Sequence, residues 1–94
     1  MTDFSMINAE IERFDRWSEP WSFEASVETQ LAGFGEELLL FQSVWATACE
    51  PEIWVSGTFV EACANTAIAI SKQYPWLSAK AVRQIANGAA YQWR

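Results

Sequence analysis

The side chains that most often perform chemistry in proteins are scarce in this chain. It has no histidine, which is the commonest general base and metal ligand, so no Ser–His or Cys–His nucleophile can form. Cys49 and Cys63 form no CxxC motif, and two cysteines alone do not make a structural zinc site. The glycines of Gly33-Phe-Gly35 are followed by two acidic residues, which would repel a phosphate. We therefore expect no catalytic residue, no metal and no cofactor, and thus not an enzyme.

Carboxylates are the one chemical group with a suggestive spacing. On a helix near the N-terminus, Glu12 and Asp15 would lie on one side of the apolar stripe, and Glu24 and Glu28 are four residues apart further on. Like charges at this spacing slightly destabilise a helix, so they form either a tolerated solvated face or a patch for a basic partner. Tryptophans nearby would serve as core residues or as interface anchors. The candidate partner-binding residues are Glu12, Asp15, Trp17, Trp21, Glu24 and Glu28.

Charge is distributed unevenly along the sequence. The net charge is −6, but residues 1–61 hold all twelve acidic side chains and only two arginines, which gives this part −10. Residues 62–94 hold four basic side chains and no acidic one. The basic segment can neutralise part of the excess by packing nearby, and a surplus acidic face should remain. Such a face favours a basic protein partner and disfavours nucleic acids and anionic membranes.

The apolar pattern predicts an all-α, compact single domain spanning residues 1–94, with four to five helices. The expected segments begin with 5–17, which ends before Pro20, and 24–48, with a break at Gly33 and Gly35 and a central apolar run at 38–41. A third helix should run from Pro51 through Ser71, although 53–60 could instead form a strand. Ser78 should cap a last helix that continues to Trp93, with Leu77 and Val82 as a hydrophobic staple.

Cysteine use and the N-terminus bear on the compartment. We expect Cys49 and Cys63 to be free thiols, because on the helical prediction they lie too far apart for a disulfide. The N-terminus lacks the basic and apolar regions of a signal peptide, and no stretch is long enough to span a membrane. These features predict a cytoplasmic protein.

In size, helical character and acidic N-terminal two thirds, the chain resembles small acidic immunity proteins of bacterial toxin–immunity pairs, of the contact-dependent inhibition or bacteriocin type. The segment Gly35-Glu-Glu-Leu-Leu-Leu40 and the tail from Tyr74 to Trp93 contribute to the resemblance. It implies an inhibitor whose acidic surface occludes the basic active site of a toxin, such as a nuclease. Two alternatives remain open: a phage-encoded inhibitor of a host defence nuclease, as anti-CRISPR proteins are, and a helical homo-oligomeric interaction module.

Overall fold

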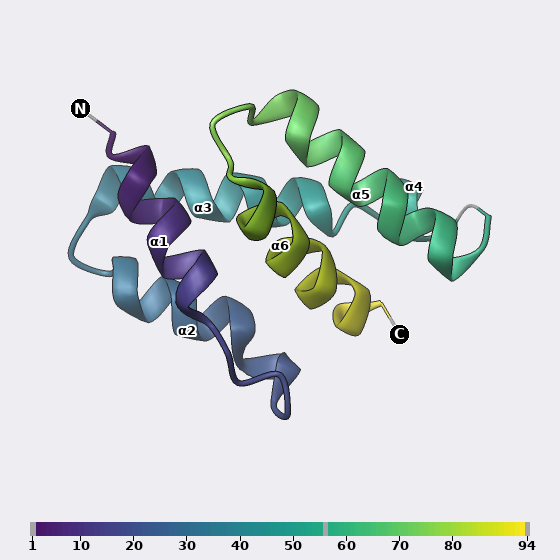
Figure 1. The fold of residues 1–94 in the computed structure, drawn as a ribbon, viewed down its shortest axis with the longest axis horizontal. Helices are drawn as coiled ribbons and strands as arrows, with labels where there is room; N and C mark the ends of the chain where they lie inside the picture. The colour runs from purple at the N-terminus through teal and green to yellow at the C-terminus, as the bar shows by residue number, and fades with distance from the viewer. Residues whose placement is uncertain (1, 56, 94) are drawn as a thin grey trace.

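The computed structural model describes residues 2–55 and 57–93, and this part of the chain is all-α and without strands (Figure 1). The predicted fold class is therefore confirmed. None of the helices in these residues is long and apolar enough to cross a membrane. The elements are α1 (Phe4–Arg13), the 3₁₀ turn η1 (Pro20–Ser22), α2 (Phe23–Leu31), α3 (Gly35–Ala48), α4 (Pro51–Trp54), α5 (Phe59–Gln73) and α6 (Ala79–Gln92).

The first helix is shorter than its sequence pattern predicts. Asp3 caps α1 by accepting a hydrogen bond from the backbone N–H of Met6 (3.0 Å), and the helix ends at Arg13 rather than at residue 17. The side chain of Gln84, from α6, supplies donors to the carbonyl oxygens of Ile11 (3.3 Å) and Phe14 (2.6 Å). A partner from another element thus satisfies the carbonyls at the end of α1, so the chain can leave the helix there.

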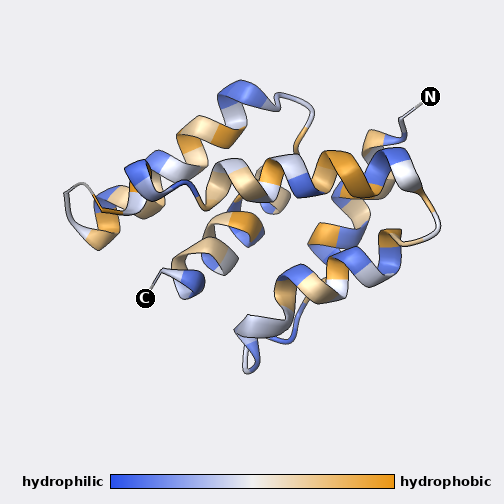
Figure 2. Cartoon of the chain, turned by 180° about the vertical axis from the view of Figure 1, so that it is seen from behind, coloured by the Kyte–Doolittle hydropathy of each residue, from blue (hydrophilic) through white to orange (hydrophobic). Residues whose placement is uncertain are grey.

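The break predicted around the two glycines is confirmed, because α2 ends at Leu31 and α3 begins at Gly35. The expectation that the whole 38–41 run is central was wrong in part. Phe41 is fully buried, whereas 66% of Leu39 is exposed. Figure 2 accordingly shows hydrophobic colour over the N-terminal half of α3 in the view from behind.

The third predicted helix is divided in two. The chain turns after α4 through Gly57, whose φ of 72° suits glycine, and α5 then starts at a capping box. Glu61 accepts from the backbone N–H of Thr58 (2.9 Å), and the Thr58 hydroxyl accepts from the N–H of Glu61 (3.1 Å). The alternative strand at 53–60 is not formed by the described residues of that range; Ser56 lies outside them.

Helix α6 lies at the centre of the arrangement and packs against α5, α1 and α3 (Figure 1). Ser78 caps it as predicted, by accepting from the N–H of Ala81 (3.0 Å), and both Leu77 and Val82 are buried in the core. Gly88 lets α6 approach α2 closely, since a Cβ there would lie 2.9 Å from the ring of Phe23. The largest fully buried side chains are Phe23, Phe41, Ile7, Ile11, Leu31, Ile70, Ile85, Val27, Val44 and Thr66.

Candidate partner-binding surface

The six predicted partner-binding residues do not form one patch, because several are used inside the fold. Glu12 accepts a hydrogen bond from the hydroxyl of Ser78 (2.6 Å), so it holds α1 against the start of α6. Trp17 stacks on Phe23 at a centroid distance of 5.7 Å and donates its indole N–H to Gln84 (3.2 Å). Both side chains are half-buried, and both have an evident role in packing the fold.

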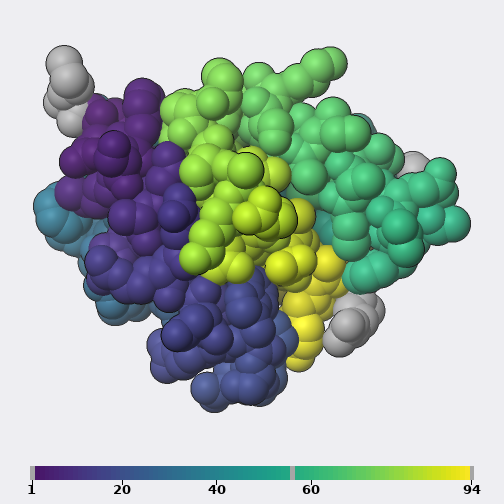
Figure 3. All heavy atoms as spheres, in the orientation of Figure 1, coloured from purple at the N-terminus to yellow at the C-terminus, as the bar shows by residue number. Residues whose placement is uncertain are grey.

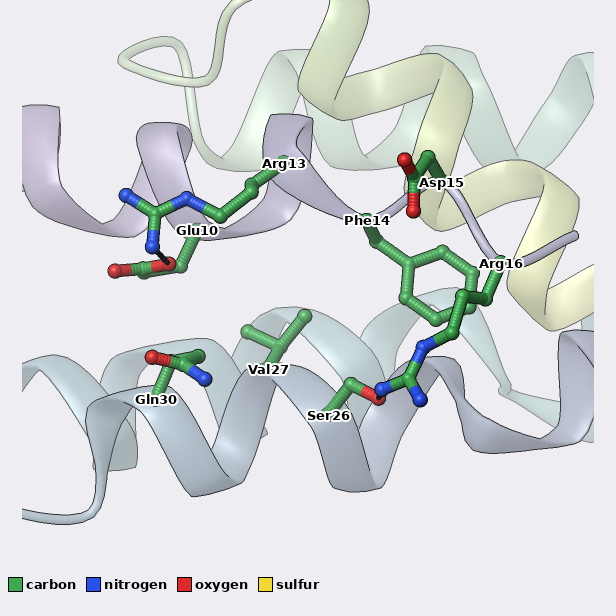
Figure 4. A pocket seen from close by; sticks show the side chains of 8 residues that line it. All are labelled: Glu10, Arg13, Phe14, Asp15, Arg16, Ser26, Val27 and Gln30. Carbon is green, nitrogen blue, oxygen red and sulfur yellow. Dashed lines mark hydrogen bonds and ion pairs between the residues drawn. The ribbon is translucent and has the colours of Figure 1, made fainter.

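Asp15 lies in another place, beside a shallow cavity of about 200 Å³ between the end of α1 and α2 (Figure 4). Phe14 forms the floor with Val27 of α2, and Arg16 reaches across to the hydroxyl of Ser26 (3.3 Å). Asp15 itself is exposed and points away from α2 in the figure. Because α1 ends at Arg13, Asp15 does not continue the helical line that starts at Glu12.

The remaining three predicted residues lie close together in the sequence, with Trp21 in η1 and with Glu24 and Glu28 one turn apart on α2. Trp21 is 63% exposed, and its ring lies 6.2 Å from that of Tyr91 on α6. Figure 3 shows this juxtaposition as the dark-blue segment around residue 20 beside the yellow end of the chain. Glu28 accepts a hydrogen bond from the side-chain amide of Gln42 on α3 (3.1 Å). Trp21 therefore lies beside the C-terminal end of α6, whereas Glu28 lies beside α3.

Glu24 is the carboxylate most affected by its surroundings. Its pKa is raised above the usual value, first by partial burial and then by the negative charge of Glu28 one helical turn away. A hydrogen bond with Trp45 of α3 acts in the opposite direction. The two carboxylates thus repel each other beside aromatic rings, in a place where a cation would relieve the repulsion.

Two tail residues that the sequence reasoning did not single out complete this surface. Trp93 is partly exposed and donates its indole N–H to the carbonyl oxygen of Cys49 at the end of α3 (3.1 Å). Tyr91 contacts Trp21, as described above. The sequence showed aromatic residues in the tail, but only the packing of α6 brings Tyr91 beside η1 and Trp93 beside the end of α3. We name the set Trp21, Glu24, Glu28, Tyr91 and Trp93 the aromatic–acidic surface.

The thiol beside this surface is poorly suited to nucleophilic chemistry. Burial, assisted by the charge of Glu24, raises the pKa of Cys49 to about 11. The thiol is therefore protonated at neutral pH, whereas the thiolate is the reactive form. Cys49 and Cys63 are both free, as expected. No group of three or more potential metal-ligating side chains occurs among the described residues.

Ion pairs contribute little to neutralising the acidic half. Within residues 2–55 and 57–93, the single ion pair joins Arg13 and Glu10, whose nearest charged atoms are 3.2 Å apart (Figure 4). It is a contact of charges without hydrogen-bond geometry, since Glu10 Oε1 has no hydrogen-bond partner. Lys72, Lys80 and Arg83 make no ion pair with another residue of that part of the chain. Direct pairing with Lys72, Lys80 and Arg83 therefore does not use up the surplus of carboxylates in the described part of the chain.

Comparison of the chain with protein-family models, with curated proteins and with solved structures found no match.

Proposed function

We propose that this chain is a non-catalytic inhibitor that binds another protein, in the manner of an immunity protein that neutralises a toxin. The observation that carries the proposal is the aromatic–acidic surface. It combines an exposed Trp21 with two carboxylates, Glu24 and Glu28, that have no ion-pair partner among the described residues. Tryptophan is enriched among the residues that dominate binding energy, so an exposed tryptophan beside carboxylates has the composition of a binding surface.

The chemistry of this surface favours a basic partner. A guanidinium or ammonium group can stack on Trp21 or Trp93 while it forms charge-assisted hydrogen bonds with Glu24 and Glu28. Binding would also relieve the repulsion that helps to raise the pKa of Glu24. Nuclease active sites carry Arg and Lys to bind phosphates, so a toxin nuclease is a partner with suitable chemistry. The cytoplasm, where such a toxin acts, is the proposed compartment.

The test begins with capture of the partner from the native host and continues with measured association and dissociation rates. Glu24→Gln with Glu28→Gln removes two charges and keeps the shapes and one acceptor oxygen in each side chain. We expect slower association and a weaker dependence on salt, because complementary charge mainly accelerates encounter. Trp21→Ala should instead raise the dissociation rate, as truncation of an anchor does. The captured partner should lose its toxic or nuclease activity when this chain is added.

A matched control comes from carboxylates elsewhere on the surface. Asp15→Asn with Glu36→Gln gives the same change of net charge at two positions outside α2. Asp15 borders the cavity that Ser26 of α2 lines. Ser26 projects about 200° around α2 from Glu24, so this cavity lies on a different side of the helix from Glu24. Equal effects of the two pairs would show that only net charge matters and would refute this site. A partner that retains full activity in the complex would refute inhibition.

A further inference from the structure

A second exposed surface lies on α5, away from the aromatic–acidic surface. The inner side of this helix is buried through Ala62, Thr66 and Ile70. Its outer side exposes 77% of Val60 and 59% of Ile68, both large apolar side chains. Isolated exposed apolar residues are common. These two lie about 80° apart around the outer side of α5, and Ile68 is the one that falls among the charged residues described next.

The charges on α5 stand at its two ends. Glu61 is in the first turn and Lys72 is in the last, and the residues between them carry no charge. At 100° per residue, Glu61, Asn65, Ile68 and Lys72 lie within about 60° of one another, in one outward stripe. All four side chains are exposed, and their spacings of four, three and four residues keep them on one side of the helix, with Ile68 as the apolar member.

This stripe is complementary to itself when reversed. If two copies of the helix run antiparallel about a twofold axis between residues 66 and 67, Glu61 lies opposite Lys72 of the second copy. Asn65 then lies opposite Ile68 of the second copy. The twofold axis repeats each contact, so the pairing closes on itself and yields a dimer rather than a filament. Parallel pairing would instead place Glu61 opposite Glu61.

We propose that α5 is the interface of a symmetric homodimer, in which it packs antiparallel against α5 of a second copy. The flanking positions Ala64, Ala67 and Ser71 are small, so the two helices can approach closely. A shallow hollow lined by Ala67, Ile68, Ser71 and Lys72 lies on the same side and leaves room for the second helix. All but one of the acidic residues lie outside α5, so their repulsion acts away from the seam.

The size of the interface predicts a weak dimer. With 15 residues, α5 is about 22 Å long, and one helix pair of this length buries less than the roughly 800 Å² per partner that stable complexes use. Dissociation constants on the order of micromolar or weaker follow. The dimer should therefore depend on concentration, and the aromatic–acidic surface should remain free in it.

Sedimentation equilibrium of the full chain, from about 10 μM to about 1 mM, tests the proposal. The wild-type chain should shift from monomer to dimer in this range. Ile68→Glu should weaken the dimer at least tenfold, and Lys72→Glu should weaken it about tenfold, since glutamate then faces Glu61 of the second copy. Lys72→Arg should retain the wild-type dissociation constant.

Leu39→Glu is the matched control for Ile68→Glu. Leu39, on α3, is exposed to a similar extent as Ile68, and both substitutions add one negative charge. Leu39→Glu should leave the dimer unchanged. Circular dichroism should give the same helical content for all variants, which separates lost pairing from lost folding. A wild-type chain that stays monomeric at about 1 mM would overturn the proposal. So would variants at residues 68 and 72 that dimerise as tightly as wild type.

Discussion

Removal of the Gln84 side-chain amide should lower the free energy of unfolding by more than a typical single substitution does. This buried side chain from α6 makes three hydrogen bonds to the last turn of α1 and the segment that follows it. It donates to the carbonyls of Ile11 and Phe14, and its oxygen accepts from the indole of Trp17. It is therefore the partner that lets α1 stop and the chain turn toward α2.

The magnitude follows from the groups that would lose their partner. Gln84→Met keeps the volume of the side chain but leaves the Phe14 carbonyl and the Trp17 indole N–H without this partner. The Ile11 carbonyl still accepts from the backbone N–H of Phe14 (3.4 Å). Each buried polar group left unsatisfied costs about 1–3 kcal/mol, and part of this cost is recovered where water can enter. We expect a loss of about 3 kcal/mol in the free energy of unfolding, and a melting temperature lower by roughly 12–24 °C for a domain of this size.

Urea unfolding followed by far-ultraviolet circular dichroism measures this loss. The control is Gln92→Met, the same substitution at an exposed position at the end of the same helix. It should change the stability by less than about 0.5 kcal/mol. If Gln84→Met were equally mild, the carbonyls at the end of α1 would be satisfied by water. Gln84 would then not determine where that helix ends.

Two further substitutions test the packing and the electrostatics. Gly88→Ala should lower the free energy of unfolding by about 1–3 kcal/mol, because the new Cβ would lie 2.9 Å from the Phe23 ring. Gly33→Ala is the control: its Cβ would meet nothing within 4 Å, so it should be neutral or slightly stabilising. Equal effects of the two substitutions in urea unfolding would argue against the close approach of α6 to Phe23. The raised pKa of Glu24 means that the native state binds its proton more tightly than the unfolded chain does, so stability is lost as the pH rises from about 4.5 through the raised native value. Glu24→Gln should therefore stabilise the fold at neutral pH and lose this advantage below about pH 4, and an advantage that persists in acid would contradict the assignment.

The candidate surface shows how far the sequence alone could lead. Trp21, Glu24 and Glu28 were identified from charge and spacing; Trp21 lies beside Tyr91 of α6, and Glu24 and Glu28 neighbour each other on α2, beside α3. The same criteria also selected Glu12 and Trp17, which the fold uses internally. A carboxylate that binds a partner and one that holds a helix cap have the same spacing in the sequence, so only their neighbours distinguish them.

The sequence by itself determined the helices whose signals are local. The Ser78 cap, the break before Gly35 and the apolar stripe of α1 each depend on residues within a few positions, since capping and helical periodicity act over one or two turns. Tertiary structure decided the rest. Gln84 is 70 residues from Phe14 in the chain, yet it ends α1, and the packing of α6 brings Tyr91 beside Trp21. Such contacts depend on how whole helices pack, which no local pattern encodes.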